Sequence, residues 1–243
     1  MSPSTAFGSR RTLFIQTEST PSDDAIRFKP GTAVLGPDAK STVEFTSRGA
    51  AQSGGSPLAA SLLSIDGILS VLFSTDAVTI TKDATTPWQL VKPDVFGALT
   101  DHFGQSPVPP VADPSLASSP PEDTVVRADD SEVVAMIKEL LDTRIRPTIQ
   151  DDGGDIEYMG FDESEGTVKL KLKGACRTCD SSVVTLKNGI ENMLQYFIPE
   201  VKKVEQVLDV AEQVAKEEFD KMEHKLMAAA EEASNFGSVQ LKQ

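Results

Sequence analysis

Hydrophobic residues alternate strictly with lysines in the segment GTVKLKLKG, residues 166–174. Val168, Leu170 and Leu172 would point to one face of a strand and the lysines to the other, because successive strand side chains alternate. The pattern predicts a half-buried strand with one solvent-facing side. The preceding segment, QDDGGDIEYMGFD (150–162), predicts a glycine turn that leads into another strand.

Two helical patterns enclose this pair of strands. Residues 131–147 place Val134, Ile137, Leu141 and Ile145 at spacings of three and four, as on one face of a helix. Ser131 is the expected N-cap and Pro147 the expected end of this helix. A second helix is expected from about 181 to 197, where Pro199 follows, and a final strand in VKKVEQV (201–207). We expect the buried stripe of this second helix to contain Val183, Leu186, Ile190, Met193 or Leu194, and Phe197. The predicted order is α-β-β-α-β.

The first half of the chain also mixes strands and helices. Short strands are expected in 12–18, 25–30 and 41–47, and a hairpin that turns at residues 74–76. The segment SPLAASLLSIDG predicts a helix with Ser56 as N-cap, Pro57 as first residue and Gly67 as end signal. A second helix is expected at 94–103, and Trp88 is interpreted as a packing residue.

A segment dense in proline, serine and alanine, residues 104–130, separates the two halves. It holds too little apolar surface to offset the entropy of ordering, so we expect a disordered linker. The predicted fold class is α+β, with two small α+β domains and a charged C-terminal helix. The expected division is a possible remnant of a targeting segment (1–11), two domains (12–103 and 131–210), the linker (104–130) and the helical tail (211–243).

Charge and composition exclude several classes of function. The net charge is −14, which disfavours nucleic acid as a partner because phosphates would be repelled. No apolar run is long enough for a transmembrane helix, so no membrane partner is expected. Two cysteines do not make a secreted disulfide scaffold, which favours a reducing compartment. Two arginines and several hydroxyl residues before Glu18 are typical of the end of a mitochondrial transit peptide, and an ordinary frayed terminus is the alternative interpretation.

Both cysteines, Cys176 and Cys179, lie in a CxxC motif between the expected strand and the expected helix. Cys179 directly precedes the helix N-terminus, whose partial positive charge stabilises a thiolate. Gly174 lets the backbone approach a bulky group closely. The sequence therefore predicts two activated thiolates on one short loop.

Three uses of such a pair are possible. Thiol–disulfide exchange also uses a CxxC at a helix start, but its usual fold has a parallel strand before the motif, whereas a hairpin is expected here. A zinc site needs four ligands, more than one chain offers. Two chains related by a twofold axis would supply four thiolates, the ligand set of an iron–sulfur cluster. The spacing alone does not separate a shared cluster from a shared zinc ion.

The residues around the motif resemble a known family. The segments IRPTIQDDGGDIEYMGFD, VKLKLKGACRTCDSSVVTLKNGIENMLQYFIPEV and VEQV are similar to the Nfu-type domain of NifU-like iron–sulfur scaffold proteins. TLFIQTESTPSDDAIRFKPGTAVL, SPLAASLLSIDGILSVLFSTDAVTITK and the tryptophan followed by LVKPDVFGAL resemble the N-terminal domain that accompanies it in mitochondrial Nfu proteins. The resemblance covers roughly residues 12–208, except the linker.

The resemblance implies a carrier, not an enzyme, in the mitochondrial matrix. It implies a [4Fe–4S] cluster, or alternatively [2Fe–2S], held between two subunits of a homodimer by Cys176 and Cys179 of each. Expected partners are upstream assembly factors and apo-proteins such as lipoyl synthase, aconitase-like enzymes and respiratory-complex subunits. The alternative is a thiol–disulfide oxidoreductase that uses the same pair.

Two acidic features of the chain, Asp180 and the aspartates of the QDDGGD turn, also bear on the cluster site. The family usually has a proline after the second cysteine, where this chain has Asp180. An added negative charge beside an anionic cluster is expected to lower its reduction potential and weaken its retention. The aspartates of the QDDGGD turn (Asp151, Asp152 and Asp155) are interpreted as solvated turn residues rather than as iron ligands.

Overall fold

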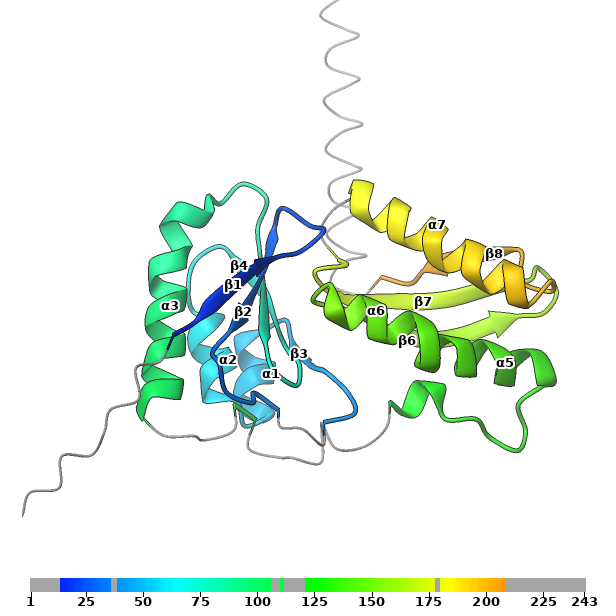
Figure 1. The fold of residues 1–243 in the computed structure, drawn as a ribbon, viewed down its shortest axis with the longest axis horizontal. Coiled ribbons are helices and arrows are strands. Elements are labelled where there is room, and N and C mark those ends of the chain that lie inside the picture. The colour runs from blue at the N-terminus through cyan, green and yellow to red at the C-terminus, as the bar shows by residue number, and fades with distance from the viewer. Residues whose placement is uncertain (1–13, 36–38, 106–109, 112–120, 178–179, 209–243) are drawn as a thin grey trace, which may run out of the picture. The chain divides into compact units, whose positions relative to one another are not determined.

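The structure, a computed structural model, describes residues 14–35, 39–105, 110–111, 121–177 and 180–208, and its strands form two sheets (Figure 1). One sheet has five strands in the order β1-β2-β5-β4-β3, and the other has three in the order β6-β7-β8. The chain divides into a unit Met1–Gln206, which holds both sheets, and a unit Val207–Gln243. The expected tail helix, 211–243, lies outside the described residues.

The five-stranded sheet is antiparallel throughout, and its hairpin of β4 and β5 confirms the expected turn at residues 74–76. The strands are β1 (Gln16–Ser19), β2 (Ala25–Lys29), β3 (Val43–Phe45), β4 (Ile68–Phe73) and β5 (Val78–Lys82). The helices α1 (Arg48–Ser53), α2 (Pro57–Leu62) and α3 (Trp88–Gln105) cover one face of this sheet (Figure 1). Their apolar residues and those of the strands form the first hydrophobic core.

The helices of this region follow the expectation in part. Ser56 is the N-cap of α2, where its side chain accepts a hydrogen bond from the Ala59 amide, and Pro57 is the first residue. The helix ends earlier than expected, at Leu62, and α1 was not expected at all. Helix α3 begins six residues earlier than expected, at Trp88, whose indole N–H donates to the Asp23 carbonyl at 2.9 Å. The packing interpretation of Trp88 is confirmed.

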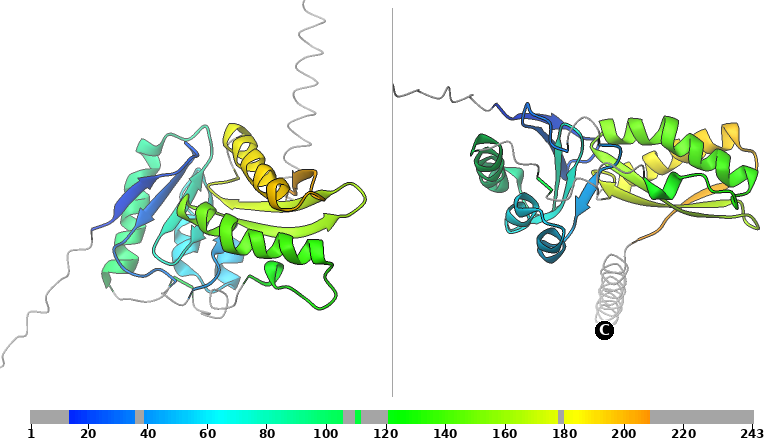
Figure 2. Two further views of the ribbon diagram at one scale, coloured as in Figure 1. Left: turned by 45° about the vertical axis from the view of Figure 1, so that its right-hand side comes forward. Right: turned by 90° about the horizontal axis from the view of Figure 1, so that it is seen from below.

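The part of the chain that contains the three-stranded sheet has the expected order of elements, α-β-β-α-β. Strands β6 (Gly154–Asp162) and β7 (Thr167–Gly174) form an antiparallel hairpin, and β8 (Lys203–Gln206) pairs in parallel with β7. Helices α5 (Glu132–Leu140) and α6 (Arg146–Asp151) lie with α7 (Asp180–Phe197) on one face of this sheet (Figure 2). The expected alternation in β7 is confirmed, since Val168, Leu170 and Leu172 are all buried in the second core.

Pro147 does not end the helix that begins after Ser131, so that prediction is wrong. A π-helical turn, η2 (Leu141–Ile145), joins α5 to α6, and Pro147 falls in the first turn of α6. A proline is tolerated in a first turn because its missing N–H has no helical partner there. The π turn thus lets the chain restart a helix at Arg146, and Ile145 and Ile149 both reach the second core.

The expectation that the whole of 104–130 is disordered is wrong at both ends. Val111 is 3% exposed and belongs to the first core, and the Ser56 hydroxyl donates to the Pro110 carbonyl at 2.6 Å. At the other end, η1 (Glu122–Thr124) is a short 3₁₀ helix. Residues 106–109 and 112–120 lie outside the described part of the chain. Within the described ranges, no helix is long and apolar enough to cross a membrane.

Candidate functional site: the two-cysteine loop

The loop that carries the cysteines leaves β7 at Gly174 and is closed by backbone hydrogen bonds. The Cys176 amide donates to the Lys173 carbonyl at 3.3 Å, and the Arg177 amide donates to the Gly174 carbonyl at 3.1 Å. The Ala175 amide donates to the Gly153 carbonyl at 3.3 Å, which ties the loop to the turn before β6. The hairpin therefore holds Cys176 at one end of the sheet.

Two glycines make room for this arrangement. Gly174 has a φ of 60°, in the left-handed region that favours glycine. A Cβ at Gly154 would lie 2.2 Å from the Cys176 sulfur, so the thiol occupies the place of a side chain at that position. The glycine pair of the QDDGGD turn was predicted as a turn signal only. Its second member in fact creates the space for the sulfur.

Cys176 is 8% exposed, and its thiol is not activated in this structure. Burial, together with the negative charges of Asp152, Asp155 and Glu44, raises the pKa of Cys176 to about 12. The prediction of two activated thiolates is therefore wrong for Cys176. A buried thiol surrounded by carboxylates has lost the solvation that a thiolate needs, whatever the helix that follows offers.

Cys179 lies outside the described residues. Helix α7 begins at Asp180, so Cys179 directly precedes it, as expected. Among the described residues, no group of three or more His, Cys, Asp or Glu side chains is placed to hold a metal ion. One chain offers two thiols to a metal or cluster. The assignment of Cys176 and Cys179 as ligands stays a prediction.

Glu44 of β3 contacts the loop from a distant part of the sequence. Its carboxylate accepts hydrogen bonds from the Gly174 amide at 2.9 Å and from the Arg177 guanidinium at 3.2 Å. The Glu44 and Arg177 side chains are only 7% and 11% exposed. Sequence reasoning missed Glu44, because nothing local to the STVEFTS segment indicates a contact 130 residues away.

Asp155 is also close to the loop, and it is not a solvated turn residue. It is 2% exposed and accepts hydrogen bonds from Arg146, Gln150 and Thr42. The interpretation of the QDDGGD aspartates as solvated is therefore wrong for Asp155, while Asp151 and Asp152 are exposed. A buried carboxylate needs such partners to offset its desolvation.

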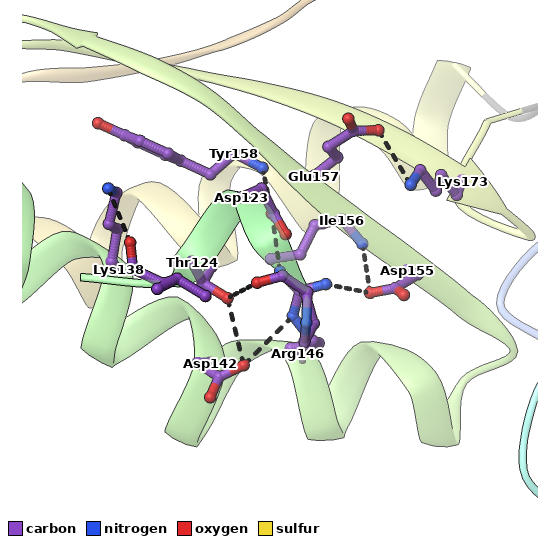
Figure 3. A network of polar contacts seen from close by, with 12 residues as sticks. Asp123, Thr124, Lys138, Asp142, Arg146, Asp155, Ile156, Glu157, Tyr158 and Lys173 are labelled. Carbon is purple, nitrogen blue, oxygen red and sulfur yellow. Dashed lines mark hydrogen bonds and ion pairs between the residues drawn. The ribbon is translucent and has the colours of Figure 1, made fainter. Parts of the chain in front are cut away.

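Arg146 connects Asp155 to η1, the short 3₁₀ helix that precedes α5 (Figure 3). Its guanidinium lies 3.3 Å from Asp155 and 2.8 Å from Asp123, and Asp123 also accepts from the Tyr158 amide at 2.7 Å. Arg146 is 5% exposed. The network ties η1, α6 and β6 together.

Lys138 adds a second link to the same segment. Its ammonium donates to Asp130 at 2.6 Å and to the Val125 carbonyl at 3.1 Å. Lys138 is itself 6% exposed. The end of the expected linker is therefore held against the second sheet by two buried cations.

The fold and the loop define a class of protein: an α+β chain with two thiols at a strand–helix junction. The expected hairpin before the motif is confirmed by the antiparallel pairing of β6 with β7, while β7 also pairs in parallel with β8, which follows α7. The family of NifU-like domains matches residues 137–205, and the family described as the Nfu/NifU scaffold protein N-terminal domain matches residues 15–106.

Relatives match over most of the chain. A NifU-like protein of Schizosaccharomyces pombe is 46% identical over 93% of this chain and 84% of its own. A Drosophila virilis protein named NFU1 iron-sulfur cluster scaffold homolog, mitochondrial, is 48% identical over 90% of this chain and 70% of its own. The chain belongs to the Nfu family of NifU-like proteins.

Two solved structures align with parts of the chain. The solution structure of a NifU-like protein from Saccharomyces cerevisiae covers 44% of this chain and 91% of its own, with a TM-score of 0.37 and 22% identity. Protein SAV1430 from Staphylococcus aureus covers 35% of this chain and 98% of its own, with a TM-score of 0.31 and 15% identity.

Proposed function

We propose that this chain is an iron–sulfur cluster carrier. Two copies would bind one [4Fe–4S] cluster between them through Cys176 and Cys179 of each chain, and pass it to apo-proteins. The observation that carries the proposal is the ligand count: a four-thiolate cluster needs four cysteines, and this chain contains two. The relatives that match most of the chain include proteins named iron–sulfur cluster scaffold homologs, which supports the same reading.

The structure of the loop favours a carrier over the thiol–disulfide oxidoreductase. An exchange reaction needs an accessible thiolate, and optimal attacking thiols have a pKa near the ambient pH. The pKa of Cys176 is raised to about 12, and its side chain is buried. Cluster ligation does not need a free thiolate in advance, because the metal displaces the proton as it binds.

The cluster is cargo in this proposal, and the protein supplies its ligands. Gly154 leaves the space that the Cys176 sulfur occupies. The clients that the family resemblance implies are lipoyl synthase, aconitase-like enzymes and respiratory-complex subunits, with upstream assembly factors as donors. We propose a mitochondrial location, in the matrix, from the relatives named mitochondrial.

Anaerobic reconstitution with iron and sulfide tests the proposal. A shared four-iron cluster gives about two irons and two sulfides per chain, in a particle of twice the chain mass. Cys176→Ser and Cys179→Ser should each lose the cluster completely, and the loaded protein should restore an apo-enzyme. A protein that stays a monomer without iron, or a dimer that holds only zinc, would contradict the proposal. So would reduction of a disulfide substrate by the iron-free monomer.

A further inference from the structure

The outer face of α7 is unusual for an exposed helix surface because it carries no Asp, Glu, Lys, Arg or His in the described stretch 184–197. The exposed residues there are Val184, Thr185, Asn188, Gly189, Asn192, Met193, Tyr196 and Phe197. We call these eight residues the α7 face. In the whole chain 25% of residues are charged, so an uncharged face about four turns long stands apart from the rest.

The two charged residues of this stretch lie to the side. Lys187 and Glu191 are half-buried, and the Glu191 carboxylate accepts a hydrogen bond from the Val204 amide of β8 at 2.9 Å. The helix therefore directs its acid towards its own sheet. The outward-facing residues of the helix itself are uncharged, and the Arg144 guanidinium of η2 lies over the ring of Phe197, 5.6 Å from its centroid.

Large apolar side chains on the α7 face are exposed. Tyr196 is 81% exposed, Val184 55%, Phe197 45% and Met193 39%. The buried stripe was expected to include Met193 or Leu194, and Phe197. Leu194 is in the core as expected, whereas Ile198 takes the core position expected for Phe197. Single exposed apolar residues are normal on protein surfaces. Four on one uncharged helix face match the aromatic and methionine enrichment, with depletion of charge, that marks protein interfaces.

Gly189 adds an independent observation. A glycine inside a helix costs about 1 kcal/mol relative to alanine. A Cβ at Gly189 would meet nothing within 4 Å, so no contact within the described part of the chain requires a glycine there. Its lack of a side chain opens the centre of the α7 face to close approach by another backbone.

The proposed function indicates what covers this face. A four-thiolate cluster brings a second copy to the loop from which α7 begins, directly after Cys179. A twofold axis through the cluster makes the contact isologous, so a surface next to the loop would meet the same surface of the other chain. Two chains of net charge −14 repel each other. The electrostatic free energy of their association is therefore least unfavourable where the contacting surfaces carry no charge. The α7 face carries no charged side chain, and it lies on the helix that follows the two cysteines in the sequence.

We infer that the α7 face is the surface through which two copies of this chain associate around the shared cluster. The inference rests on the proposed function and adds where the two chains touch. The face is about 20 Å long, from a rise of about 1.5 Å per residue. One helix face offers less than the roughly 800 Å² per partner of a standard stable interface. The contact therefore holds the dimer only together with the cluster, and the iron-free chain is a monomer.

Charge introduced on the α7 face tests the inference. Asn192→Glu and Met193→Glu place two like charges across the twofold axis, which costs association energy. Both positions are exposed, so the thermal unfolding of the iron-free chain should be unchanged. Leu90→Glu is the matched control, because Leu90 is a 69% exposed apolar residue on α3. Each variant is reconstituted anaerobically, and iron per chain and particle mass are measured over a range of protein concentrations.

We expect the dissociation constant of the loaded dimer to rise at least about tenfold in both face variants and not in Leu90→Glu. Mixing Asn192→Glu chains with Asn192→Lys chains should restore the loaded dimer, since opposite charges then meet. Face variants that load and dimerise like the unchanged protein would overturn the inference, including the case in which only transfer to an apo-enzyme is lost. If the unchanged protein takes up no iron, it is the proposed function that fails.

Discussion

Arg146 and Cys176 are both buried polar groups of the second sheet's region, and they are surrounded in opposite ways. Arg146 is a cation among carboxylates, held by Asp123 and Asp155 at 2.8 and 3.3 Å. Cys176 would have to lose a proton to bind metal, yet its burial and, after it, three carboxylates raise its pKa. The first environment stabilises the charged form of its residue, and the second disfavours it. Asp155 takes part in both.

This difference distinguishes the Arg146 network, which stabilises the fold, from the Cys176 thiol, whose protonation state would change on metal binding. The Arg146 network gains from every partner it has, so it anchors η1 to α6 and β6. In the Cys176 loop, the surroundings of the thiol favour its protonated form. Metal binding would replace the proton with a cation, which compensates the same carboxylates. Four substitutions test this comparison.

Removal of Arg146 should have the largest effect on stability. Arg146→Met leaves Asp123 and Asp155 buried without their cation, which costs about 3–5 kcal/mol of unfolding free energy. Asp142→Asn is the control, because Asp142 lies 3.7 Å away with a half-exposed side chain and should cost less than about 1 kcal/mol. Urea denaturation measures both. Equal losses in the two variants would show that the network is not the anchor.

Gly154→Ala should have the next largest effect, at the thiol itself. The added Cβ would lie 2.2 Å from the Cys176 sulfur, so the loop must move, at a cost of about 1–3 kcal/mol. Gly97→Ala should instead be neutral or stabilising, since a Cβ there meets nothing within 4 Å. The cost at Gly154 should shrink when Cys176 is replaced by alanine. Persistence of the full cost in that double variant would assign it to the backbone.

The reactivity of Cys176 should depend on pH in a direction set by its surroundings. Its pKa is raised from 9.0 to about 12, so the protonated thiol stabilises the fold below pH 9 and this contribution is lost as the pH rises towards 12. In a Cys179→Ser chain, iodoacetamide should therefore modify Cys176 slowly at neutral pH and faster as the pH rises.

Glu44→Gln removes one of the charges that raise this pKa and should increase the modification rate severalfold at a fixed pH. The glutamine still accepts from the Gly174 amide, so the loop keeps its hydrogen bond. Glu163→Gln, an exposed acid in the β6–β7 turn, is the control. An unchanged rate in Glu44→Gln would mean that its charge does not act on the thiol.

Asp180→Pro should have the smallest effect. Asp180 is the first residue of α7, where a proline is also well accommodated. Loss of one negative charge beside the proposed cluster should raise its reduction potential and slow its loss to a chelator. Electrochemistry and chelator release on the reconstituted protein measure both quantities. If neither changes, the charge of Asp180 does not influence the cluster.

Local patterns were enough to predict most of the elements around the site. The alternation of Val168, Leu170 and Leu172 predicted a half-buried strand, and the structure places it in β7. The helix after the CxxC motif was also predicted from its own residues, and the structure has it as α7. Local rules misjudged Pro147, because they do not foresee that a π turn moves the proline into the first turn of a new helix.

The sequence by itself determined the order of strands and helices in the second half of the chain, the position of the cysteine pair and its count of two thiols per chain. These depend on neighbouring residues and on composition. The burial of Cys176, the sulfur's place over Gly154 and the contact of Glu44 with Gly174 were decided only by the tertiary structure. They follow from packing between segments far apart in the chain, which no local periodicity records. The protonation state of the thiol depends on those segments, and so only the folded structure could show it.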